Sequence, residues 1–153
     1  MPKQIVNDQS LREVLSTLSN VRQRELGGLF VASVGHLSAD PRVSRAVAVA
    51  AQAEISPQEL EEAYRSVKAF ATQTYTACGR DADWAAQAEH FAAAAAAASL
   101  TPDEQPEVKG NNAWRAAMQA RMAKNCEMIL KDEGGLDNEA EKQYRLAAEF
   151  LSR

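Results

Sequence analysis

The sequence has little of several residue types on which specialised proteins depend. Only two of its 153 residues are cysteine, two are histidine, and aromatic residues make up 6% of the chain. Cys78 and Cys126 do not stand in a CxxC-type spacing, so we expect buried thiols rather than a zinc or disulfide framework. With so few aromatic residues, small side chains must fill much of the core, which allows helix axes to approach closely.

Basic residues are not in excess, because the chain has 17 lysines and arginines and 21 aspartates and glutamates. Its formal net charge is −4. Proteins that bind nucleic acids or anionic membranes normally have a basic excess, so neither partner is expected. The longest apolar run, Leu26 to Leu37, contains glycines. This run is about half as long as the ~20 residues that a membrane-spanning helix needs. The N-terminal residues lack the apolar run of a signal peptide, and we expect a cytoplasmic protein.

Apolar residues (46%) and alanine in particular are abundant, and the length suits one domain over residues 1–153. Several short motifs are typical of helix starts, because a polar cap precedes either proline or a glutamate. They lie at Ser10 with Glu13, at Asp40 with Pro41, at Ser56 with Pro57, and at Thr101 with Pro102. We therefore predict an all-α fold, a compact bundle of six to seven helices.

The segment 41–54 is apolar on almost every helical face, because its valines and alanines leave few polar residues to meet water. A helix of that kind normally lies in the interior, so we predict that 41–54 is the buried central helix. The run from Ala92 to Ala98 has high helix propensity but little apolar area per residue, and we expect Trp84 and Phe91 to anchor it.

Three glycines, Gly27, Gly28 and Gly35, stand in a predicted helix over about 21–37. A glycine inside a helix costs roughly 0.5–1 kcal/mol relative to alanine, so their presence indicates either a kink or a close helix crossing, and we favour the crossing. The residues 101–112 form the longest predicted connection, because Pro106 interrupts any helix begun at Pro102. We expect this linker to be mobile and a candidate for partner contact.

No catalytic motif is present: the sequence has no nucleophile elbow, no phosphate-binding glycine loop and no HExxH pair. His36 lies four residues before Asp40, which fits a metal or acid–base pair, but also a histidine stabilised by a helix C-terminus. Glu89 and His90 are adjacent and point about 100° apart on a helix, so they cannot chelate one ion. We predict no enzyme, no metal and no cofactor.

Residues 49–65 show the apolar spacing of a helix-turn-helix, which makes a DNA-binding regulator one alternative. Two features argue against it. Glu54 stands where glycine is usual in the turn, and Glu59, Glu61 and Glu62 would repel phosphates from the second helix. An ordinary helical hairpin is the favoured interpretation.

Our leading hypothesis is a non-enzymatic module that binds another protein or itself. The candidate contacts are surface acids, which suit a basic partner, and one methionine off the apolar stripe of its helix. They are Glu59, Glu61, Glu62, Asp103, Glu104, Glu107 and Met128. The second alternative is a small-ligand-binding helical domain, which would require a sizeable pocket that reaches His36, His90 or Cys78.

Overall fold

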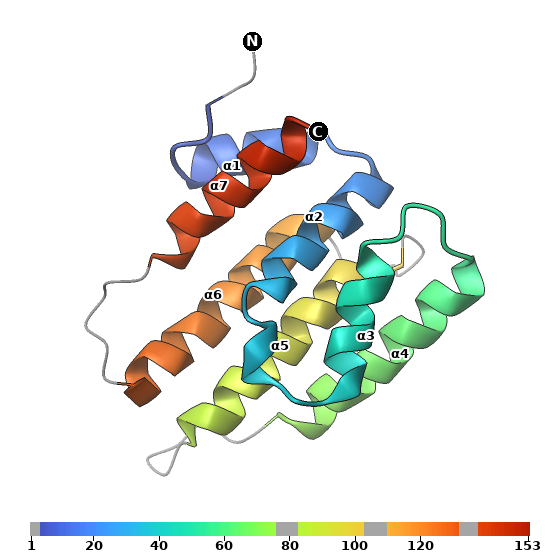
Figure 1. Cartoon of the computed structure of the whole chain (residues 1–153), viewed down its shortest axis with the longest axis vertical. Coiled ribbons are helices and arrows are strands. Elements are labelled where there is room, and N and C mark those ends of the chain that lie inside the picture. The colour runs from blue at the N-terminus through green and yellow to red at the C-terminus, as the bar shows by residue number, and fades with distance from the viewer. Residues whose placement is uncertain (1–3, 76–82, 103–109, 132–137) are drawn as a thin grey trace.

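The computed structural model describes residues 4–75, 83–102, 110–131 and 138–153. Over these residues the chain is helical and contains no strand, which confirms the all-α prediction (Figure 1). The helices are α1 (Asp8–Ser16), α2 (Asn20–Ala32), the 3-10 helix η1 (Gly35–Leu37), α3 (Pro41–Ala50), α4 (Pro57–Gln73), α5 (Trp84–Leu100), α6 (Asn112–Lys131) and α7 (Glu139–Leu151).

The helix starts follow local capping. Asp40 caps α3 and Ser56 caps α4, each with proline at the first helical turn, as predicted. The prediction for α1 was displaced by three residues, because Asn7 is the cap and Ser10 completes the capping box with it. Asn111 accepts the amide of Trp114 at 3.0 Å and so begins α6. Residues 103–109 of the predicted 101–112 linker lie outside the described residues.

The central helix is α5, which packs against α2, α3, α4 and α6 (Figure 1). No residue from Ala86 to Leu100 is exposed. The prediction that 41–54 is the centre was wrong, because α3 ends at Ala50 and leaves Ser44, Arg45 and Ala48 in solvent. The alanine run of α5 takes the centre because methyl side chains let four helices approach it at once.

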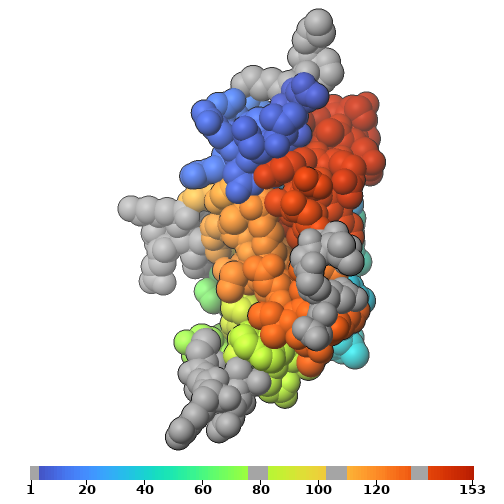
Figure 2. Space-filling view, turned by 90° about the vertical axis from the view of Figure 1, so that its left-hand side faces the viewer, coloured from blue at the N-terminus to red at the C-terminus, as the bar shows by residue number. Residues whose placement is uncertain are grey.

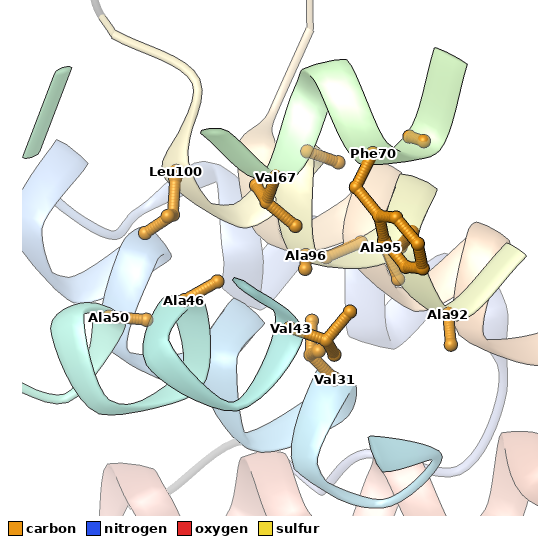
Figure 3. Close-up of a cluster of buried hydrophobic side chains, with 14 of the residues drawn as sticks. Val31, Val43, Ala46, Ala50, Val67, Phe70, Ala92, Ala95, Ala96 and Leu100 are labelled. Atoms are coloured by element: carbon orange, nitrogen blue, oxygen red, sulfur yellow. The ribbon is translucent and has the colours of Figure 1, made fainter. Parts of the chain in front are cut away.

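Two groups of apolar side chains form the core. The larger surrounds α5, where valines and Phe70 from neighbouring helices pack onto its alanines (Figure 3). The smaller joins α1, α2, α6 and α7 through Leu11, Leu26, Phe30 and Phe150. Figure 2 shows α1, α6 and α7 side by side on one face of the molecule. The expected anchor Trp84 is 37% exposed, so larger residues of other helices bury α5 rather than its own tryptophan.

Two adjacent glycines of α2 permit close helix approach. A Cβ added at Gly28 would lie 2.6 Å from the Cβ of Ala50 in α3, and one at Gly27 would lie 3.2 Å from the Cβ of Ser99 in α5. Gly28 therefore lacks room for a side chain and Gly27 has a tight contact, which confirms the predicted close crossing. Gly35 is different, since nothing lies within 4 Å of its added Cβ.

This difference predicts the effects of two alanine substitutions. Gly28→Ala forces α2 away from α3, and we expect it to lower the free energy of unfolding by about 1–3 kcal/mol, as overpacked cores do. Gly35→Ala meets no neighbour, so its unfolding free energy should stay within about 1 kcal/mol of the wild type. Urea denaturation measures both, and equal stability of the two variants would contradict the close crossing.

Candidate functional site

A groove of about 480 Å³ runs between α4 and α6, across α5. Its apolar surface comes from Tyr64 and Ala71 of α4, the alanines of α5, and Trp114 and Met118 of α6. The three alanines of α5 that line it, Ala94, Ala97 and Ala98, leave the space between α4 and α6 unfilled. The same small side chains that let helices approach on the other faces of α5 therefore leave room here.

Two arginines that do not line the groove lie against the ring of Trp114. The guanidinium of Arg12 lies 4.9 Å from its ring centroid and that of Arg121 lies 5.8 Å from it. Arg121 is in turn fixed by two hydrogen bonds to Asp8, at 2.7 and 3.0 Å, and by one to Gln143. The hydrogen bonds from Arg121 lower the pKa of Asp8, and the bonds to Asp8 and Gln143 join α1, α6 and α7.

Two cationic side chains line the groove. Lys68 donates from Nζ to the hydroxyl of Tyr64 at 3.0 Å, and Arg115 donates from Nη1 to Thr101 Oγ1 at 3.3 Å and to Asn112 Oδ1 at 3.4 Å. All of these acceptors are neutral, and within the described part of the chain neither cation pairs with a carboxylate. Burial lowers the pKa of Arg115, which reflects how poorly its charge is solvated.

His90 closes one end of the groove. Its Nδ1 lies 2.9 Å from the carbonyl oxygen of Ala71, which can only accept, so Nδ1 carries a proton in this arrangement. Tyr75 packs edge-on against the imidazole, with ring centroids 5.5 Å apart. Glu89 accepts a hydrogen bond from Ser38 at 2.9 Å and does not line the groove, as its divergence from His90 on the helix predicted.

His36 does not pair with Asp40, which was one of the two interpretations, but lies in the last turn of η1. Its Nε2 lies 2.6 Å from the carboxylate of Glu127, which is buried, while Asp40 caps α3 and binds Arg42. Lys124 and Lys131 also contact Glu127, at 2.8 and 3.4 Å. Burial alone would raise the pKa of Glu127, but hydrogen bonds from Lys124 and His36 outweigh it and lower the pKa from 4.5 to about 2. This cluster ties η1 to α6.

The structure describes four of the seven predicted partner-binding residues. Glu59, Glu61 and Glu62 are exposed on α4, but Glu61 pairs with Arg65 at 2.8 Å and Glu62 with Arg45 at 3.3 Å. Met128 is half-buried rather than exposed. Asp103, Glu104 and Glu107 lie outside the described residues. A role for these residues in partner binding stays a prediction.

The 49–65 segment differs from a helix-turn-helix in its connection. Residues 51–56 separate α3 from α4. That is longer than the turn of about three or four residues that the DNA-binding motif uses. DNA binding itself stays a prediction that the sequence disfavours.

Sequence patterns did not identify the groove. Lys68 and Arg115 look like ordinary solvent-facing residues of amphipathic helices, and Trp114 and Met118 look like core residues. The distinguishing observation is that α4 and α6 place them on opposite sides of a row of alanines. One signal was available: His90 was a named test of the ligand-binding alternative, and the groove does reach it.

Comparison of the chain with models of protein families, with curated proteins and with solved structures gave no significant match. Among the described residues, no group of three or more histidines, cysteines or carboxylates could hold a metal ion. The described helices also include none that is long and apolar enough to cross a membrane. Cys126 is buried, as predicted, and Cys78 lies outside the described residues.

The Glu127 cluster predicts a specific acid sensitivity. Because the folded-state pKa of Glu127 is about 2 and its ordinary value is 4.5, its stabilising contribution is present above about pH 5 and is lost as the pH falls toward 2. We expect Glu127→Gln to remove up to about 3 kcal/mol of unfolding free energy at pH 7. The loss should shrink steadily as the pH is lowered to 2.

The matched control is Glu149→Gln, since Glu149 is exposed on α7. Chemical denaturation at a series of pH values between 7 and about 2 gives the unfolding free energy of each variant. A Glu127→Gln curve parallel to that of the wild type would show that the carboxylate is not stabilised by its cationic neighbours.

Proposed function

We propose that this chain is a non-enzymatic ligand-binding domain, and that the groove between α4, α5 and α6 takes a small molecule with an apolar body and one anionic group. This develops the small-ligand alternative rather than the protein-interaction hypothesis. The observation that carries it is the pair of cations, Lys68 and Arg115, which line an apolar groove and have only neutral hydrogen-bond partners among the described residues.

Electrostatics favours an anionic ligand. A guanidinium that is partly removed from water needs either a carboxylate or several strong acceptors to offset the lost solvation. Arg115 has two long hydrogen bonds to neutral oxygens, and burial lowers its pKa. A carboxylate or sulfonate between Arg115 and Lys68 would supply charge-assisted hydrogen bonds, which are about twice as strong as neutral ones. This local need is independent of the chain's negative net charge.

The size and lining of the groove favour a small molecule with an apolar body. Its volume of about 480 Å³ is in the range of ligand pockets, roughly 300–1,000 Å³. Tyr64, Trp114 and Met118 offer two aromatic rings and a flexible thioether to an apolar chain or ring. The acidic edge of α4 gives weaker support to a protein partner, because Glu61 and Glu62 already pair with arginines of the same chain.

Binding of decanoate tests the proposal, with decanol as the uncharged probe of similar size. The variant Trp84→Phe leaves Trp114 as the single tryptophan, so its fluorescence reports on the groove. We expect saturable binding in which decanoate has at least ~10-fold higher affinity than decanol, because one charge-assisted hydrogen bond is worth roughly 1.5–3 kcal/mol.

Charge removal supplies the matched comparison. In the Trp84→Phe background, Arg115→Met and Lys68→Met should each reduce decanoate affinity several-fold and leave decanol affinity nearly unchanged. The control variants Arg145→Met and Lys142→Met each remove one positive charge from an exposed position of α7. They should have little effect on the affinity for either probe. Equal affinity for the two probes, or equal losses in all four variants, would reject an anion site in the groove.

A further inference from the structure

Arg24 of α2 is a buried cation whose charge has no counterion among the described residues. Arg24 as a whole residue is only 8% exposed to solvent. Its Nη2 donates to the carbonyl oxygens of Gln52 and Ala53, at 2.5 and 3.5 Å, and its Nε is buried without a hydrogen-bond partner. Backbone carbonyls carry only partial charges, so a buried guanidinium with an unpartnered nitrogen is costly to maintain. Such a residue calls for an additional acceptor.

Arg24 lines a second cleft, of about 440 Å³, which shares Thr101 with the lining of the groove. The first residues of three helices line it as well: Asn20 of α2, Pro57 of α4 and Asn112 of α6. The first turn of a helix has amide N–H groups without intrahelical partners and a partial positive charge. Three positive helix ends and one buried arginine therefore border the same space.

One carboxylate also lines this cleft, that of Glu61. Glu61 is exposed on α4 and binds Arg65 at 2.8 Å, so its charge is largely balanced before any ligand enters. It does not contact Arg24 within hydrogen-bond distance. The neutral polar residues Ser99 and Asn112 complete the polar lining and can donate or accept.

We propose that this cleft is a second, separate binding site, and that it takes a small oxyanion, either a phosphate or a carboxylate group, with Arg24 as its charged contact. The anion would accept a charge-assisted hydrogen bond from the guanidinium on the side that lines the cleft, while Nε itself stays buried. Its remaining oxygens would meet first-turn amides that have no cap partner, such as those of Val21 and Gln58, because Pro57 has no N–H and the amide of Asn112 already donates to Gln23. The evidence for this site is Arg24 and the helix N-termini, so it is independent of the ligand proposed for the α4–α5–α6 groove.

The test is amide chemical-shift mapping by NMR on the whole chain, with inorganic phosphate in one arm, acetate in a second and chloride in a third, all at one ionic strength. We expect saturable shifts at Val21, Arg24, Gln58 and Ser99 with phosphate or with acetate, and none with chloride. The arm that saturates at the lower concentration identifies the class of oxyanion. No saturable shift in either arm, or shifts spread over exposed lysines and arginines, would overturn the proposal.

Substitution at Arg24 gives the second measurement. Arg24→Gln keeps a donor for the carbonyl of Gln52 but removes the charge, and should weaken oxyanion binding at least ~10-fold. Lys68→Met lowers the charge of the groove by the same amount and should leave oxyanion binding unchanged. If Arg24→Gln does not fold, the wild type remains decisive: its melting temperature should rise saturably with the bound oxyanion and not with chloride. A rise that is equal in all three salts would overturn the site.

Discussion

Close approach of helices to the alanine face of α5 is the constraint on which the rest of this structure depends. Each of α2, α3, α4 and α6 contacts α5, and side chains of one to a few carbons lie between them. At Gly28 the methyl group of Ala50 lies so close to the backbone of α2 that no additional methyl group fits between the two helices. The fold is therefore held by many small van der Waals contacts, and a single methyl group added at the wrong position has a large effect.

A core of small side chains also explains where the larger and charged residues lie. Tyr64, Trp114 and Met118 line the groove between α4 and α6. Tyr64 is also part of the larger core group, and Trp114 and Met118 pack against the smaller one. The charged residues beside the packed helices differ in burial, since Glu127 and Arg24 are buried, Arg115 is half-buried and Lys68 is exposed. Glu127 is balanced by His36, Lys124 and Lys131, whereas Lys68, Arg115 and Arg24 have only neutral partners in the described structure.

This contrast among the charges is the basis of both proposed binding sites. A balanced cluster such as that of Glu127 stabilises the fold, since each charge has its partner. A partly buried cation with neutral partners instead leaves unused binding capacity beside a cavity. Both clefts have this property, although the chain as a whole is acidic, because local desolvation rather than net charge decides what a site can bind.

The sequence by itself determined the helical class, the caps of α3 and α4 and the tight approach at Gly27 and Gly28, because each depends on a few neighbouring residues and their intrinsic conformational preferences. Only the tertiary structure decided that α5 rather than 41–54 is central, that His36 meets Glu127, and that Lys68 and Arg115 share a groove. An apolar or charged residue looks the same in the sequence whichever helix comes to lie beside it. Its neighbours follow from how α2, α3, α4 and α6 pack on the small side chains of α5, and that is a property of the whole packing.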